Sequence, residues 1–462
     1  MTHAMTHTSE TQAIEATAPG AAVRAARRQA VIEAMRAAGG GVAILPTAPE
    51  RMRNRDSDYP YRWDSYFHYL TGFPEPEAVL VIVADAQRAE SILFCREKNE
   101  ERETWDGFRH GPQAAAQRFG FDRGLPIGSL DEEVPKLLAN RTALFHALGA
   151  DETLDARVRL WLGDVRAQAR AGVGSPTRAI DLLSILDEMR LRKDESELET
   201  MRRAARISAA AHRRAMLATT PGRFEYEIEA ELLYEFRRQG SQAPAYGSIV
   251  ATGRNACVLH YRANDDRLRD GELLLIDAGC ELDGYASDIT RTFPVNGRFT
   301  GAQRTLYDIV LAAQHAAIEA TRPGARFDDP HNAAVAVLAQ GMIDAGLLSG
   351  SRDGVIESGA YRRFYMHRTS HWLGMDVHDC GDYQEPGELD ADGNRPWRIL
   401  RPGMVLTIEP GIYVRAADDV PPAMHDIGIR IEDDAVVDAQ GCEIITSDVA
   451  TDPDEIEALM RG

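Results

Sequence analysis

Two aspartates in the segment DAGCELDGYASD, Asp277 and Asp288, lie on either side of the pair Asp283-Gly284. An Asp-Gly pair between two β-rich runs, here 272–282 and 285–295, predicts a tight hairpin turn. With those two residues as the loop, Asp277 is the diagonal cross-strand neighbour of Asp288, at a Cα separation of roughly 7–8 Å. From that spacing two carboxylates can hold a pair of divalent ions about 3.5–4 Å apart. Most strand carboxylates simply face solvent, so a metal site requires further ligands.

Two more carboxylates occur downstream in strand-like runs. VLTIEPGIYV alternates apolar and polar residues up to Glu409, and the following Pro410 favours an extended conformation for it. IGIRIEDD alternates isoleucines against Gly428, Arg430 and Glu432. A second pair of strands therefore offers Glu409 and Glu432 from polar faces.

Three of the 13 histidines fall between these two regions, in MHRTSHWLGMDVHD: His367, His371 and His378. A lone histidine is more often a structural group than a ligand, and clustering weakens that interpretation. The four-residue step from His367 to His371 would suit a helical metalloprotease pair, but no glutamate follows the first histidine. The Trp-Leu-Gly run after His371 favours an extended segment, so we reject a helical zinc site.

The pattern of expected helices and strands that must position these residues indicates two domains. We expect a disordered tail over residues 1–20, a mixed α/β domain over 21–188 and an α+β domain over 189–462. The strand-like runs of the first domain are 42–45, 78–84, 91–95 and 142–148. A capping box at Asp194 and Glu197 begins the second domain with a helix. Further helices are predicted near 223–239, 302–321 and 330–345, and strands at 272–282, 285–295, 404–409 and 427–432.

Composition excludes several classes of function. The formal net charge of −20 on 462 residues disfavours nucleic acid and anionic lipid as partners. Five cysteines without a C-x-x-C pair fit a reducing compartment rather than a disulfide framework. The start of the chain lacks a basic segment and an apolar run, and no stretch is long and apolar enough to span a membrane. We expect a cytoplasmic protein.

The ordered set Asp277, Asp288, His371, Glu409 and Glu432 resembles the five-ligand signature of the pita-bread (creatinase/aminopeptidase) metallopeptidases. The contexts LLLIDAGCELDGYASDITRTFPV, HWLGMDVHD, VLTIEPGIY and GIRIEDD are most similar to the Xaa-Pro aminopeptidase (aminopeptidase P) branch. RNRDSDYPYRWDSYFHYLTGFPEPEAVLVIV resembles the N-terminal domain of that branch. The resemblance implies a pita-bread catalytic domain preceded by a smaller α/β domain.

The resemblance also implies a dinuclear hydrolase. Four carboxylates and one imidazole suit two divalent ions such as Mn²⁺, whose charge they balance. By the family pattern, Asp277 binds one ion, His371 and Glu409 bind the other, and Asp288 and Glu432 bridge both. A metal-bridging hydroxide then attacks the peptide, and Glu409 shuttles a proton to the leaving nitrogen. The residues assigned outer roles around the reacting carbonyl are His260, His367, His378 and Arg430, although Arg430 could instead form an ordinary strand ion pair.

The implied substrate is a peptide with proline in second position, whose N-terminal residue is released. Tyr413 and Trp105 could line the proline pocket or belong to the core. Ser370 resembles the aminopeptidase branch, since prolidases more often carry glycine there. Two departures stand out: Arg368 lies where the family often has glycine, and an acidic loop over 382–396 precedes the Glu409 strand, where it could alter access or attract a substrate ammonium.

Other functions remain open. A prolidase acting on dipeptides would share every ligand. A metal-free relative that hydrolyses a small amidino compound should lack the carboxylates, and a peptidase-like binding module without catalysis should have lost ligands or gained a basic surface. Relatives commonly assemble as dimers or tetramers, so we expect a homodimer or homotetramer.

Overall fold

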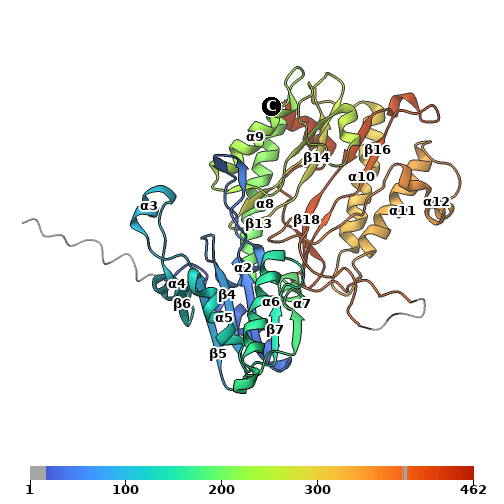
Figure 1. The fold of residues 1–462 in the computed structure, drawn as a ribbon. Helices are drawn as coiled ribbons and strands as arrows, with labels where there is room; N and C mark the ends of the chain where they lie inside the picture. The colour runs from blue at the N-terminus through green and yellow to red at the C-terminus, as the bar shows by residue number, and fades with distance from the viewer. Residues whose placement is uncertain (1–16, 388, 390–392, 462) are drawn as a thin grey trace, which may run out of the picture. The chain divides into compact units, whose positions relative to one another are not determined.

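A computed structural model describes residues 17–387, 389 and 393–461 (Figure 1). The chain divides into two compact units, the first ending at Leu186 and the second beginning at Asp187. Of the expected disordered tail, residues 1–16 lie outside the described residues; at Ala18 the backbone N–H donates to the carbonyl of Arg118 at 2.9 Å. Among the described helices, none is long and apolar enough to cross a membrane.

The first unit contains a six-stranded mixed sheet in the order β6-β5-β4-β1-β7-β8. Its strands are β1 Gly41–Pro46, β4 Val79–Ala84, β5 Ala89–Cys95, β6 Arg123–Pro126, β7 Ala143–His146 and β8 Arg178–Asp181. The pairs β1–β4 and β4–β5 are antiparallel, whereas β1–β7, β5–β6 and β7–β8 are parallel. A separate ribbon joins β2 Met52–Asn54 and β3 Ser57–Asp58. The mixed α/β architecture predicted for this region is confirmed.

Helices complete the first unit, because the sheet's apolar side chains need cover. They are α1 Ala21–Ala37, α2 Ser65–Thr71, α3 Glu100–Asp106, α4 Pro112–Phe119, α5 Leu130–Leu138 and α6 Glu152–Ala167, and α7 Leu183–Leu191 crosses the division between the units. Val134 of α5 and Trp161 of α6 share a buried cluster with Val81 and Ile92 of the sheet.

Among the described residues, the second unit contains the four predicted helices and two more. They are α8 Glu195–Ala218, α9 Glu225–Arg238, α10 Gly301–Ala320, α11 Asp329–Asp344, α12 Arg352–Ser358 and α13 Pro453–Arg461. The predicted capping box of Asp194 and Glu197 starts α8, and a second capping box, of Thr300 and Gln303, starts α10. Each box satisfies two backbone N–H groups that the first turn of a helix leaves unpaired.

Two β-ribbons form the centre of the second unit, with α8 and α9 on one side and α10 and α11 on the other (Figure 1). The first ribbon pairs β11 with β14 and β12 with β13, and the second pairs β15 with β18 and β16 with β17. The strands of the second unit are β9 Ala243–Pro244, β10 Ile249–Thr252, β11 Leu273–Asp277, β12 Cys280–Leu282, β13 Tyr285–Ala286, β14 Thr290–Pro294, β15 Val405–Ile408, β16 Gly411–Val414, β17 Ile427–Arg430, β18 Asp433–Val437 and β19 Cys442–Ile444. The predicted α+β class is confirmed.

The turn of the first ribbon has the predicted two-residue loop. Asp283 and Gly284 both have positive φ, 50° and 83°, as a primed hairpin turn requires. Asp277 pairs with Thr290, two residues beyond Asp288, so the predicted diagonal relationship of the two aspartates is confirmed. A Cβ atom at Gly279 would lie 1.7 Å from the carbonyl oxygen of Ser287, so the close approach of the strands there needs glycine.

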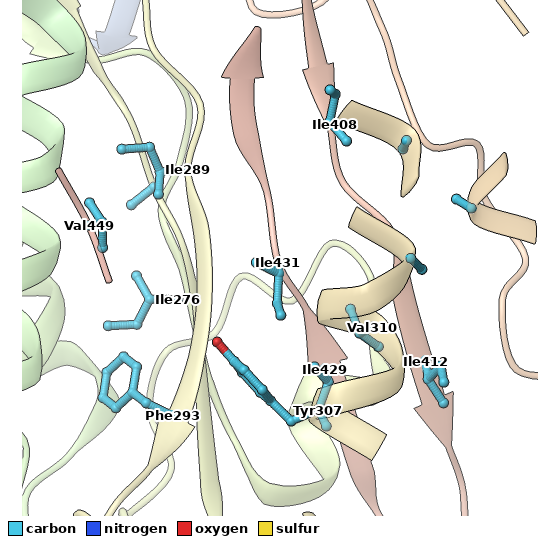
Figure 2. Packing of buried hydrophobic residues seen from close by; sticks show 14 of the residues in the cluster. Ile276, Ile289, Phe293, Tyr307, Val310, Ile408, Ile412, Ile429, Ile431 and Val449 are labelled. Atoms are coloured by element: carbon cyan, nitrogen blue, oxygen red, sulfur yellow. The ribbon is translucent and has the colours of Figure 1, made fainter. Parts of the chain in front are cut away.

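An apolar layer backs the ribbons (Figure 2). Ile276 and Phe293 of the first ribbon and Ile429 and Ile431 from the second belong to one buried cluster, which also contains Tyr307 of α10. Burial of each such side chain contributes roughly 1.5–3 kcal/mol. Strand alternation turns the residues between the isoleucines to the opposite face, and the apolar layer thereby fixes where the polar side chains point.

Candidate metal centre

The structure brings the sequence-predicted site residues to one cavity of about 370 Å³ in the second unit. All nine line it: His260, Asp277, Asp288, His367, His371, His378, Glu409, Arg430 and Glu432. They come from segments up to 172 residues apart in the sequence (260 to 432), so their convergence is a property of the fold. Their chemical roles stay predictions.

The first ribbon contributes the two aspartates at its centre. Asp277 ends β11, and Asp288 lies between β13 and β14. The hydroxyl of Tyr246 lies 2.6 Å from Oδ1 of Asp277 and also contacts Oδ1 of Asp288. Tyr246 therefore holds the two carboxylates toward each other. The sequence did not predict this residue, because an isolated aromatic in a loop carries no periodic or motif signal.

The second ribbon contributes the two glutamates. The pairs Ile408–Asp433 and Gly411–Arg430 share one register, which places Glu409 opposite Glu432 between the two ladders. The backbone N–H of Glu432 donates to the carbonyl of Thr290 at 3.0 Å and joins this ribbon to the first. The Glu432 carboxylate also accepts from the Thr290 hydroxyl at 2.6 Å.

His371 reaches the carboxylates from the extended segment that the sequence predicted. The N–H of Thr407 donates to the carbonyl of His371 at 3.0 Å, and Trp372 forms a bridge with Leu406. The imidazole Nδ1 donates to the carbonyl of Trp372 at 2.9 Å. Nε2 is thereby directed into the site, 3.5 Å from Oδ2 of Asp288.

The donor set fits divalent cations. One ligand atom from each of Asp288, His371 and Glu432 lies within 4.8 Å of the others. Burial raises the pKa of Asp277 and of Glu432, and it raises the pKa of Glu409 to about 7. Four carboxylates this close, two of them buried and two partly buried, repel one another, and Arg430 and His371 offset only part of their charge. Two dications would balance the four negative charges, and a carboxylate-rich set with one imidazole suits hard divalent ions.

Arg430 is almost fully buried, at 4% exposed, and is paired within the site. Its Nη2 donates to Oδ2 of Asp277 at 2.5 Å, Nε donates to the hydroxyl of Thr290 at 3.1 Å, and Nη1 donates to the hydroxyl of Tyr413 at 2.9 Å. Arg430 therefore forms the ion pair that the sequence left open, with a candidate metal ligand as its partner, and its outer role around the reacting carbonyl stays a prediction.

The outer histidines surround the carboxylates. His367 Nδ1 donates to the carbonyl of Arg368 at 2.8 Å, which leaves Nε2 to accept from the Tyr413 hydroxyl at 2.8 Å. Burial, with the nearby Arg430, lowers the pKa of His367 to about 3, so its ring is neutral at physiological pH. The ring of His378 packs edge-on against that of His371 with centroids 4.4 Å apart, and burial lowers the pKa of His378.

The residues suggested for a proline pocket have different positions. Tyr413 is 2% exposed and lies behind His367 and Arg430 rather than in the cavity lining. Trp105 belongs to α3 of the first unit and is 81% exposed. Ser370 is buried and lines the cavity. The cavity's apolar lining comes from Ile249, Leu259 and Val377, none of which the sequence singled out.

The acidic loop over 382–396 is described only in part, because residues 388 and 390–392 lie outside the described residues. At its base, the N–H of Glu385 donates to the carbonyl of Pro396 at 2.8 Å, and Gln384 bridges Trp397. The effect of this loop on access stays a prediction.

Comparisons with known proteins agree with this geometry. Residues 199–439 match the model of metallopeptidase family M24, and residues 24–145 match the aminopeptidase P N-terminal domain. The chain is 45% identical over 435 residues to a Xaa-Pro aminopeptidase of Escherichia coli, covering 94% of this chain and 96% of that protein. It is similar to the solved structure of Pseudomonas aeruginosa aminopeptidase PepP, with a TM-score of 0.92, 48% identity and coverage of 96% and 98% of the two chains. It is also similar to Escherichia coli aminopeptidase P with the inhibitor Pro-Leu, at a TM-score of 0.91, 44% identity and coverage of 96% and 98%.

Proposed function

This chain belongs to metallopeptidase family M24, and from that premise we propose that it is a Xaa-Pro aminopeptidase, which releases the N-terminal residue from peptides with proline in second position. Its two units correspond to the aminopeptidase P N-terminal domain and the pita-bread catalytic domain. The observation that carries the proposal is the convergence of Asp277, Asp288, His371, Glu409 and Glu432 on one cavity.

The proposed enzyme uses two divalent ions, and we propose Mn²⁺ for both. Four carboxylates and one imidazole favour Mn²⁺ over a thiolate-preferring metal. By the family pattern, Asp277 would hold one ion, His371 and Glu409 would hold the other, and Asp288 and Glu432 would serve both. When bound, such ions acidify a water molecule and polarise the scissile carbonyl.

Hydrogen bonds from neighbouring groups keep the ligands in place. Tyr246 donates to both aspartates, Arg430 donates to Asp277, and Thr290 donates to Glu432. Such contacts fix the direction of these three carboxylates before a metal arrives, which favours binding because less ordering remains to be done.

Glu409 handles the proton of the reaction. Burial raises its pKa to about 7 in the metal-free site, and a carboxyl that faces the cavity can act there as a general acid–base. This step matters for an Xaa-Pro bond, because the proline nitrogen must gain a proton before it departs. His260 and His378 lie around the same cavity and supply donors for the negative charge that develops on the carbonyl oxygen. Both ring nitrogens of His367 are already hydrogen-bonded, to Arg368 and Tyr413, so His367 lines the cavity without a free N–H.

Proline specificity follows from what the bond lacks. An Xaa-Pro amide has no N–H, so recognition must rely on the ring's shape rather than on a backbone hydrogen bond. Ile249, Leu259 and Val377 offer an apolar wall for such a ring. We place the proline ring against this wall.

A direct test uses metal-stripped protein. Addition of Mn²⁺ should restore hydrolysis of an Xaa-Pro-Yaa peptide, and Asp288→Asn should abolish it. An enzyme that cleaves Xaa-Pro but not Xaa-Pro-Yaa would be a prolidase instead. Failure to cleave either peptide with Mn²⁺, Co²⁺ or Zn²⁺ would refute the proposed activity.

The cellular setting is also proposed from chemistry. Five unpaired cysteines suit a reducing compartment, so we propose a cytoplasmic location. The net charge of −20 opposes binding to nucleic acid or anionic membranes. We propose a homodimer or homotetramer, a state that sedimentation would measure.

A further inference from the structure

Two arginines, Arg262 and Arg368, line the metal-centre cavity in addition to Arg430. Both are exposed, whereas Arg430 is buried and paired with Asp277. Within the described residues, neither Arg262 nor Arg368 has a carboxylate partner, whereas Arg430, Arg398 and Arg291 form ion pairs. Among the described residues, the cavity therefore presents two positive groups without a carboxylate partner.

The guanidinium of Arg368 has a defined position. Its Cζ atom lies 4.5 Å from the centroid of the Trp397 ring, a cation–π contact. Trp397 is itself half-buried and packs against Phe327, with ring centroids 6.3 Å apart. A guanidinium whose face contacts an aromatic ring keeps its N–H edge free for a planar, bidentate acceptor such as a carboxylate.

Arg368 lines the cavity and is the sequence neighbour of a residue close to Glu409. It directly follows His367, whose Nδ1 is 3.6 Å from Oε2 of Glu409. Glu409 is the group proposed to protonate the proline nitrogen, so we place the proline-containing product beside His367 and Arg368. The substrate's ammonium is attracted to the carboxylates of the site, and the opposite end of the substrate is attracted to Arg262 and Arg368.

Arg262 adds to the positive potential from another wall. A Cβ atom at Gly247 would lie 3.8 Å from Nη1 of Arg262, so this guanidinium lies beside the segment that carries Tyr246. At position 368, where this chain has arginine, the family often has glycine. A glycine there would contribute no positive charge to the cavity.

We propose that Arg368, assisted by the potential of Arg262, binds a carboxylate on the leaving portion of the substrate. The proposal rests on the proposed function and narrows its substrate class to Xaa-Pro peptides with a negative charge just after the proline. That charge is either the free C-terminus of a short peptide or an acidic side chain in a longer one.

The main experiment compares an Xaa-Pro-Yaa tripeptide with its C-terminal amide on the Mn²⁺-loaded enzyme. The free acid should have a KM about fivefold lower, the size of one partly exposed ion pair. Arg368→Gln should bring this ratio close to one. The matched control Arg401→Gln removes an equally exposed arginine outside the cavity and should keep the wild-type ratio.

A second peptide pair identifies the source of the carboxylate. Longer amidated peptides with Glu or Gln after the proline differ only in one side-chain charge. A preference for Glu assigns the site to acidic side chains, and a preference confined to the free tripeptide assigns it to the C-terminus. Either preference supports the proposal if Arg368→Gln removes it.

Binding of the product gives a readout that does not depend on turnover. Calorimetry with Pro-Leu and Pro-Leu-amide should show the same discrimination in the wild type and its loss in Arg368→Gln. Equal affinity for acid and amide in the wild type, or unchanged discrimination in the variant, would overturn the proposal. Absence of Xaa-Pro-Yaa cleavage would instead refute the proposed function, while calorimetry would still decide the role of Arg368.

Discussion

Thr290 and Glu432 are joined twice, once through the backbone and once through their side chains. The N–H of Glu432 donates to the carbonyl of Thr290 at 3.0 Å, and the Thr290 hydroxyl donates to the Glu432 carboxylate at 2.6 Å. This pair connects the two ribbons at the point where both present candidate ligands. A carboxylate proposed to contact both ions is therefore oriented by a residue of the opposite ribbon.

Thr290→Val should weaken metal binding, because it removes the hydroxyl and keeps the size and branching of the side chain. We expect a loss of about 10- to 100-fold in Mn²⁺ affinity, the usual effect of removing a hydrogen bond to a metal ligand. Calorimetric titration of metal-stripped protein with Mn²⁺ measures this loss of affinity. Thr290→Ser keeps the hydroxyl and should stay near wild type; equal affinities for the two variants would disprove this role.

Tyr246→Phe should also weaken metal binding, in this case through the two aspartates of the first ribbon. The phenol contacts both Asp277 and Asp288, and without it two buried carboxylates lose a shared donor. We expect an affinity loss of about 10- to 100-fold. Tyr226→Phe, at a half-exposed position on α9, provides the matched control. Wild-type affinity in Tyr246→Phe would show that the aspartates need no such support.

Much of this centre was predictable because its ligands follow local rules. The Asp283-Gly284 turn fixes the register of the first ribbon, and that register alone makes Asp277 the diagonal neighbour of Asp288. Strand alternation directs Glu432 away from the isoleucines that pack against α10. Turn chemistry and period-two patterning are short-range, so a sequence displays them directly.

The supporting contacts were not predictable, because they join segments that are distant in the sequence. Tyr246 lies in a loop, and only the fold brings its hydroxyl to Asp277. In the sequence, Thr290 has only the features of a β-branched strand residue. Its contact with Glu432 depends on how the two ribbons pack against each other. Trp105, proposed from its residue type, is exposed on another unit. Periodicity identifies faces of elements, but it does not identify which faces meet.

His378→Asn should lower kcat without changing metal affinity. The ring lines the cavity and packs against His371 but is not among the proposed ligands, and its lowered pKa keeps it neutral as a donor. Removal of one donor to a developing oxyanion costs about 100-fold in kcat. Steady-state kinetics and metal titration together check this. His315→Asn, on an exposed face of α10, should match wild type. A parallel loss of metal affinity would place His378 among the ligands.

A buried cluster of charged side chains stabilises the loop that carries His378. Asp379 accepts from Arg190 Nη2 at 2.7 Å and from Lys193 Nζ at 2.8 Å, and all three side chains are 1% exposed. The N–H of Asp379 also closes the loop by donating to the carbonyl of Trp372 at 3.0 Å. Loss of this one carboxylate would leave two buried cations without their shared partner.

Asp379→Asn should therefore destabilise the protein by about 3–5 kcal/mol at neutral pH, the usual effect of breaking a buried pair from one side. Burial alone would raise the pKa of Asp379, but Lys193 and Arg190 outweigh it and hold the pKa below 3.8. An acid whose pKa is lower in the folded state contributes stability above its unfolded pKa, and that contribution disappears as the pH falls through the folded pKa. The difference in free energy of unfolding between wild type and Asp379→Asn should thus be constant above about pH 5 and shrink below about pH 4. Urea unfolding across this range measures it, with the exposed Asp353→Asn as control; a difference that stays constant down to about pH 3 would show that the Asp379 charge does not stabilise the loop.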